Sequence, residues 1–95
     1  MSDGRIQKLT VPKWGLTMTQ GRVVQWLVPE GAEVDAGAEI VDIETEKLAS
    51  AVEAPVEGVL RRQVAGEGDL VPVAGLLGVI ADRDVTDEQI DALIE

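Results

Sequence analysis

The sequence predicts an all-β fold: a flattened barrel or sandwich of two small antiparallel sheets. Two observations lead to this prediction. Short segments rich in Val and Ile are separated by some of the ten glycines and four prolines of the 95-residue chain, which is typical of strands joined by turns. The first half of the chain also resembles the second. With no Phe or Tyr and only two Trp, the core is expected to consist of Val, Leu, Ile and Ala.

Six segments have the composition of β-strands. They are residues 6–11, 22–28, 39–44, 49–54, 59–65 and 76–81, with two very short candidates around Val34 and Val71. On propensity alone, residues 44–54 (ETEKLASAVEA) would also suit a helix, because Glu, Lys, Leu and Ala favour helices. The internal repeat decides in favour of strands.

The repeat is seen when residues 21–44 are aligned without gaps on residues 58–81. The identical pairs are Gly21/Gly58, Glu30/Glu67, Gly31/Gly68, Val34/Val71 and Ile43/Ile80. Two half-units of this size cannot each bury an apolar face alone, so they are expected to pack on each other about an approximate two-fold axis. That axis places the turn at 45–48 at the opposite end of the molecule from the segment that begins at residue 82.

Composition and charge exclude several classes of function. The formal net charge of −10 argues against nucleic acid and anionic membranes as partners, since both call for an excess of Lys and Arg. Without Cys or His, a zinc site, a Ser–His–Asp triad and a Cys–His dyad are ruled out. No apolar run has membrane-spanning length, and the first residues match neither a secretory signal nor a transit peptide. We therefore expect a cytoplasmic protein that is not an enzyme by itself.

Lys47 is the residue that calls for an explanation. It lies in the turn between the half-units, where Glu46 and Lys47 would be the central residues of a β-turn that starts at Thr45. A type I turn accommodates such residues without positive φ. A surface lysine is usually a solvated charge, but this position also suits an amine that must project freely.

Residues 11–60, from VPKWGLTMTQG through DIETEKLASAV to PVEGVL, resemble the lipoyl domain of 2-oxo acid dehydrogenase complexes. A proline-led loop, a Gly before the second strand, an EG turn and an ET-acid-K turn follow one another in order. The resemblance covers residues 6–81 and points in particular to the acetyltransferase of bacterial acetoin-cleaving systems. It implies a barrel-sandwich hybrid fold with pseudo-two-fold symmetry, and it implies that Lys47 carries lipoic acid in amide linkage.

The same resemblance implies a set of partners. A lipoate ligase or lipoyl transferase would modify the lysine, and a thiamine-diphosphate dehydrogenase or decarboxylase would reductively acetylate the arm. An acetyltransferase catalytic domain would pass the acetyl group to coenzyme A, and the flavoprotein dihydrolipoamide dehydrogenase would reoxidise the dithiol. The PKWGLTMTQG loop is similar to that of acetyl-handling complexes, which favours acetoin cleavage first and pyruvate oxidation second. In this cycle the domain is a non-catalytic bacterial carrier.

Four neighbours of Lys47 are candidate recognition elements for these partners: Glu44, Thr45, Glu46 and Leu48. The two glutamates are equally compatible with plain solubility charges. Thr45 is expected first of all to stabilise the turn through its hydroxyl.

Residues 13–20 form a loop that has no counterpart in the second half, because Gly21 follows Pro12 by nine positions whereas Gly58 follows Pro55 by three. The resemblance places this loop beside the lipoyl turn, where it helps partner enzymes to select the domain. Trp14 is the candidate for that recognition and is equally compatible with packing.

Three other apolar residues are expected to pack. Leu16 and Met18 should fold back over the end of the barrel, and Trp26 should be a core or half-buried residue of its strand.

The chain is expected to consist of a disordered N-terminus (1–5), the carrier domain (6–81) and an acidic linker or short C-terminal helix (82–95). Thr86 and Gln89 have the spacing of a capping box. The apolar residues at helical spacing behind them are Ile90, Leu93 and Ile94. In the resembled acetyltransferase a catalytic domain of α/β-hydrolase type follows, so we expect the chain to be part of a longer protein.

Three alternatives stay open. Biotin carrier domains share the fold and modify a hairpin lysine, but they typically place Met on both sides of it, where this chain has Glu46 and Leu48. The carrier protein of glycine cleavage also bears lipoyl-lysine but is usually longer. From another class, the chain could be an unmodified barrel that acts only as an interaction module.

Overall fold

Eight strands and one helix make up the part of the chain that the computed structural model describes, residues 6–94. In chain order they are β1 (Ile6–Thr10), β2 (Gln20–Trp26), β3 (Glu33–Val34), β4 (Glu39–Glu44), β5 (Ala49–Glu53), β6 (Gly58–Gln63), β7 (Leu70–Pro72), β8 (Leu76–Ala81) and α1 (Asp87–Ile94). The expectation of a disordered segment at 1–5 lies outside these described residues. Over the described range, no helix has the length and apolar character needed to cross a membrane.

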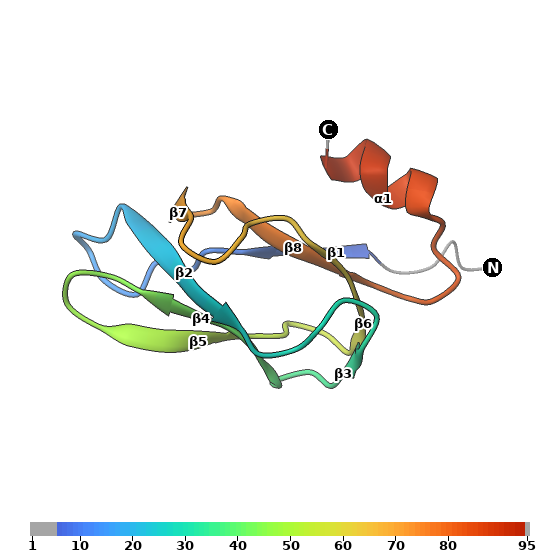
Figure 1. Ribbon diagram of the computed structural model, residues 1–95, viewed down its shortest axis with the longest axis horizontal. Helices are drawn as coiled ribbons and strands as arrows, with labels where there is room; N and C mark the ends of the chain where they lie inside the picture. The colour runs from blue at the N-terminus through green and yellow to red at the C-terminus, as the bar shows by residue number, and fades with distance from the viewer. Residues whose placement is uncertain (1–5, 95) are drawn as a thin grey trace.

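The strands form two antiparallel four-stranded sheets that lie face to face (Figure 1). One has the order β1-β8-β6-β3 and the other β5-β4-β2-β7. The predicted architecture of two small antiparallel sheets is confirmed, as two separate sheets and not as a closed barrel. Residues 49–53 pair with β4, from Glu44 opposite Ala49 to Glu39 opposite Glu53, so this segment is a strand and the alternative helix is wrong.

The two sheets are related by the symmetry that the repeat predicts. Replacing β2, β3, β4 and β5 by β6, β7, β8 and β1 converts the strand order of one sheet into that of the other. Gly31 and Gly68, which the repeat aligns, have φ of +94° and +91°. Because this left-handed conformation favours glycine, both half-units keep a glycine at the same turn.

The core between the sheets is aliphatic, as predicted. Its fully buried side chains include Leu9, Val23, Ile40, Ile43, Leu60, Leu77 and Ile80. Trp26 is partly buried against this core, and its indole Nε1 donates a hydrogen bond to the Ala65 carbonyl at 2.9 Å. The prediction of a half-buried Trp26 is confirmed.

Helix α1 covers the outer face of β8. Val79 and Ala81 form a second buried cluster there, which includes Ile90 of the helix. The positions that the repeat aligns with them in β4 are Asp42 and Glu44, which are polar and only partly buried. The sheet that carries β8 therefore has an apolar outer patch that needs a cover, and its counterpart does not.

The N-terminus of α1 is held in two ways. The predicted capping box is confirmed, since the Thr86 N–H donates to Gln89 Oε1 at 2.9 Å and the Gln89 N–H donates to Thr86 Oγ1 at 3.1 Å. Arg61 and Arg62 of β6 form ion pairs with Asp87 at 3.0 and 3.3 Å. Their hydrogen bonds, that of Arg61 first, hold the pKa of Asp87 below its ordinary value. The helix is thus docked on the sheet.

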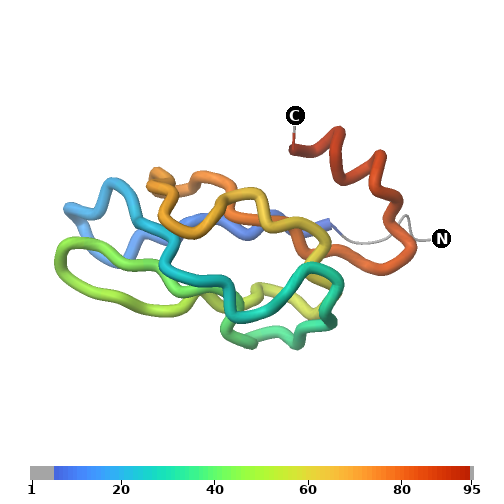
Figure 2. Tube along the Cα trace, in the orientation of Figure 1, coloured from blue at the N-terminus to red at the C-terminus, as the bar shows by residue number. Residues whose placement is uncertain are grey.

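The molecule is elongated, with Cα extents of 44 × 25 × 22 Å. The β4–β5 hairpin lies at one end of the long axis, and α1 lies at the other (Figures 1 and 2). The turn at 45–48 is therefore far from the helix, as the approximate two-fold axis predicts.

Candidate functional site: the β4–β5 turn and its groove

The turn of the β4–β5 hairpin consists of residues 45–48. The Thr45 N–H donates to the Leu48 carbonyl at 2.7 Å and closes the turn. Glu46 and Lys47 are exposed at its tip. Neither has a positive φ, since Ala74 is the one non-glycine residue with positive φ within residues 6–94. The predicted turn with Glu46 and Lys47 at its centre is therefore formed without backbone strain.

The hydroxyl of Thr45 ties the turn together. Its oxygen accepts the N–H of Lys47 at 3.3 Å and that of Leu48 at 3.2 Å, and the hydroxyl donates to the Leu48 carbonyl at 3.2 Å. A threonine hydroxyl can serve as donor and acceptor at once. The predicted structural role of Thr45 is confirmed: it fixes the backbone at Lys47 and leaves the side chain of Lys47 free.

The charged side chains around the turn differ in whether they form ion pairs. Glu44 forms an ion pair with Arg22 at 3.0 Å, across the β2–β4 ladder in which the two residues are direct partners. Among the ion pairs of residues 6–94, none involves Lys47 or Glu46. The amine of Lys47 therefore has no structural ion-pair partner in the described chain, and Glu46 is the acidic neighbour whose charge is not already paired.

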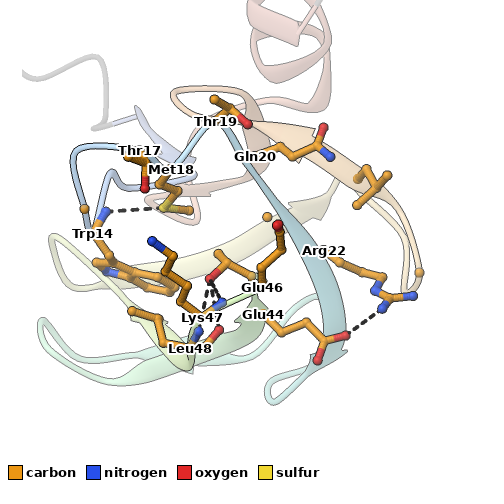
Figure 3. Close-up of a pocket in the computed structure, with 15 residues that line it drawn as sticks. Trp14, Thr17, Met18, Thr19, Gln20, Arg22, Glu44, Glu46, Lys47 and Leu48 are labelled. Atoms are coloured by element: carbon orange, nitrogen blue, oxygen red, sulfur yellow. Dashed lines mark hydrogen bonds and ion pairs between the residues drawn. The ribbon is translucent and has the colours of Figure 1, made fainter.

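The loop at 13–20 lies beside this turn, on the core (Figure 3). Trp14 and Met18 are partly buried against the core, and the Trp14 N–H donates to Met18 Sδ at 3.3 Å. The expected packing of Met18 is confirmed, and Trp14 packs as well. The expected packing of Leu16 is wrong, because its side chain is 94% exposed. Leu16 lies in the tight turn closed by the Met18 N–H and the Gly15 carbonyl, which projects its side chain away from the core.

A groove of about 670 Å³ runs between the turn and the loop. It brings together all of the site residues predicted from the sequence, which are Lys47, Glu44, Thr45, Glu46, Leu48 and Trp14. Figure 3 shows Glu44, Glu46, Lys47 and Leu48 on the hairpin and Trp14 on the neighbouring loop.

Among the other residues that line the groove, Arg22 and Leu70 were not predicted from the sequence. Leu70 of β7 is 61% exposed. The repeat aligns Leu70 with Glu33, and a leucine in place of a surface acid could have indicated an apolar surface from the sequence. The pairing of Arg22 with Glu44 depends on strand register and could not be predicted in this way.

The chemistry of the site is that of an attachment point. It offers one exposed primary amine on a fixed backbone, and the chain has no Cys or His to act as a nucleophile or base beside it. A group linked to this amine would extend from the tip of the hairpin, with an open groove at its side. A symmetric β-sandwich with an exposed lysine at the tip of a hairpin has the architecture expected of a carrier domain.

Comparisons with known proteins agree with this class. The family model described as "Biotin-requiring enzyme", which represents biotin- and lipoyl-attachment domains, matches residues 7–80. Two curated relatives are the dihydrolipoyllysine-residue acetyltransferase components of acetoin cleaving systems. The one from Pseudomonas putida is 50% identical over 91 residues, and the one from Cupriavidus necator is 55% identical over 83 residues. These matches cover 96% and 87% of this chain but 25% and 22% of the relatives.

Two solved structures are also similar. The lipoyl domain of the 2-oxoglutarate dehydrogenase complex from Azotobacter vinelandii has a TM-score of 0.63 and 34% identity, over 77% of this chain and 92% of that one. Urea carboxylase from Kluyveromyces lactis has a TM-score of 0.69 and 25% identity, over 80% of this chain and 6% of that one.

The chain belongs to the biotin/lipoyl attachment family, and it is similar to the lipoyl domain of a 2-oxo acid dehydrogenase complex and to parts of two dihydrolipoyllysine-residue acetyltransferases. It spans about a quarter of the length of the two curated relatives. The resemblance predicted from the sequence is thereby confirmed.

Proposed function

We propose that this domain carries lipoate in amide linkage on Lys47 and presents it to the enzymes of an acetoin or pyruvate dehydrogenase complex. The observation that carries the proposal is the placement of Lys47: an exposed amine without an ion-pair partner, on a turn fixed by Thr45, at the end of the molecule opposite α1. A group held there can reach into another protein while the body of the domain stays outside.

The residues around Lys47 fit such a group. Attachment converts an ammonium into an amide, which moves the formal charge from −10 to −11 by loss of one positive charge. When bound, lipoate supplies a dithiolane that takes up an acyl group on reduction and gives it up to another thiol. The domain contributes presentation and recognition, as is usual where a cofactor carries the reactive atoms.

Different residues are suited to different partners. A lipoate ligase or lipoyl transferase needs the amine and the turn, so we assign its recognition to Thr45, Glu46 and Leu48. Glu44 is assigned a smaller role in this recognition, because its charge is already paired with Arg22. Trp14 and its loop border the same groove and are assigned to the thiamine-diphosphate component, which must select this domain among other lipoyl proteins.

The remaining partners are proposed from the family resemblance stated above. An acetyltransferase catalytic domain with coenzyme A and a dihydrolipoamide dehydrogenase complete the cycle, and the domain itself is non-catalytic. The two acetoin-system relatives support acetoin cleavage before pyruvate oxidation. Tethering would give the arm an effective concentration of about a millimolar at the next site. Residues 82–95 are assigned as the connection to a following catalytic domain, and the compartment as the bacterial cytoplasm.

Biotin is the alternative group, and the likeness to a carboxylase supports it. The residues beside Lys47 favour lipoate, because Glu46 and Leu48 stand where biotin carriers typically have methionines.

Incubation with purified lipoate ligase or biotin ligase, followed by peptide mapping, distinguishes lipoate from biotin as the attached group. We expect lipoyl mass on the Lys47 peptide and no biotin. Lys47→Arg should abolish the modification, and Lys13→Arg, an exposed lysine in the neighbouring loop, should retain it. Biotin on Lys47, or lipoate on another lysine, would contradict the proposal.

A further inference from the structure

The groove beside Lys47 has an apolar wall made of Trp14, Met18, Leu48 and Leu70. Leu70 is 61% exposed and Leu48 is 42% exposed. The chain has a formal charge of −10, yet two leucines are exposed at this one groove. Covering their apolar surface would lower the free energy. The groove has a volume of about 670 Å³, which is in the range of sites for small molecules.

Lys47 is itself part of this groove. In Figure 3 its side chain does not point straight away from the molecule; it extends along the groove toward Trp14 and Met18. A group linked to its Nζ therefore starts at the edge of the groove, within reach of the apolar wall.

We propose that the groove is the resting site of the arm on Lys47, in which the aliphatic chain and the dithiolane ring lie against Trp14, Met18, Leu48 and Leu70. This inference rests on the proposed attachment of lipoate to Lys47. The arm is then not freely extended between its visits to partners. It exchanges between a docked and an extended state.

The chemistry of the two lysine forms explains why docking would depend on modification. The ammonium of free lysine is strongly hydrated, so the apolar wall does not favour it. The modified side chain is a neutral amide followed by methylene groups and a disulfide, which are apolar apart from the amide. Sulfur also contacts aromatic rings favourably, and the indole of Trp14 offers such a face.

Tethering makes weak contacts sufficient. A group confined beside its own site has an effective concentration of about a millimolar. An intrinsic dissociation constant of about 1 mM, which is weak for any site, then already fills the groove about half of the time. Binding this weak also lets a partner enzyme capture the arm easily.

Nuclear magnetic resonance of the full chain, unmodified and fully loaded by lipoate ligase, tests the proposal. The two Trp indole N–H groups give separate signals, and Trp26 is an internal control because it does not line the groove and its Nε1 is held by the Ala65 carbonyl. We expect loading to shift the Trp14 signal and leave that of Trp26 in place. Nuclear Overhauser contacts should join the protons of the arm to the Trp14 ring.

Two matched variants test the wall of the groove. Leu70→Ser removes an exposed apolar side chain from it, and Leu27→Ser removes one that is 40% exposed and lies elsewhere. Leu70→Ser should lose at least half of the loading-dependent shift of Trp14, and Leu27→Ser should retain it.

The intact mass and the peptide map of each sample distinguish a failure of the attachment to Lys47 from a failure of the docking. Absence of added mass on Lys47 would overturn the proposed function and the docking with it. Complete loading of Lys47 with no shift of Trp14 and no Overhauser contacts would overturn the docking alone. An equal shift in Leu70→Ser and in the parent chain would also overturn it.

Discussion

The hydroxyl oxygen of Thr45 lies 3.3 Å from the backbone nitrogen of Lys47 and accepts its N–H. The same oxygen accepts the N–H of Leu48 at 3.2 Å, so one side chain positions the backbone of the lysine from below the tip. No atom of this network belongs to the lysine side chain. The shape of the turn and the amine of Lys47 can therefore be changed by separate mutations.

Thr45→Val should weaken the turn, because it removes a hydroxyl with three hydrogen bonds at a part-exposed site. We expect a loss of about 1 kcal/mol in the free energy of unfolding, measured by urea denaturation, together with slower modification by the ligase. Thr45→Ser keeps the hydroxyl and is the matched control. Equal modification rates for Thr45→Val and the parent chain would show that the ligase does not depend on the fixed turn.

The position of the amine should matter as much as its presence. Glu46→Lys combined with Lys47→Glu keeps composition and charge but moves the amine by one residue around the turn. Since both residues are exposed, stability should change by no more than about 0.5 kcal/mol. Lipoylation, followed by intact mass, should fall to a small fraction of that of the parent chain. Full modification of the swapped variant would mean that any exposed amine at this tip is sufficient.

Leu16 is the most suitable position for testing recognition by the 13–20 loop. It is 94% exposed, so replacing its side chain removes no core packing. Trp14, by contrast, packs on the core, so truncating it also loosens the fold. We expect Leu16→Ser to be lipoylated and to melt like the parent chain. Its reductive acylation by the thiamine-diphosphate enzyme should fall about three- to tenfold, the effect of losing roughly 1 kcal/mol of binding free energy.

The matched control for Leu16 is Val24→Ser, an exposed apolar residue of β2 that lies outside the groove. Unchanged acylation of Leu16→Ser, or an equal loss in Val24→Ser, would argue against a specific contact through this loop.

Helix α1 should contribute to stability and not to modification. Ile90 is fully buried against the outer face of β8, and truncation of such a residue costs about 2–5 kcal/mol. Ile90→Ala should therefore lower the midpoint of thermal unfolding, whereas Glu88→Ala, exposed in the same helix, should change it little. Where the variant is folded, lipoylation of Lys47 at the far end should proceed as in the parent chain. A melting curve unchanged by Ile90→Ala would show that the docked helix contributes nothing to the fold.

Much of the fold was predictable because the repeat constrains it twice. Aligned glycines such as Gly31 and Gly68 mark the same left-handed turn in both halves, and the aligned strands occupy equivalent places in the two sheets. The position of Lys47 was predictable for a related reason, since it lies in the turn that joins the two halves. Strand ends were less certain: residues 22–28 were expected where β2 is Gln20–Trp26.

What could not be predicted depends on contacts between distant segments. The exposure of Leu16 follows from the turn at Gly15–Met18, and a short irregular loop has no periodicity from which its apolar residues could be assigned to a face. The docking of α1 does have a signal in the sequence, because Val79 and Ala81 replace the polar Asp42 and Glu44 of the other half-unit. The differences between the two half-units, as well as their identities, thus indicate the covered face.

Peptide mapping of the protein purified from its native host is the decisive test of lipoate attachment, because it reports the group that the cell itself attaches. We predict that the peptide containing Lys47 carries the mass of a lipoyl amide, and that the peptides with Lys8 and Lys13 are unmodified. A biotinyl mass on Lys47, an unmodified Lys47 in cells supplied with lipoate, or lipoate on Lys8 or Lys13 would contradict it.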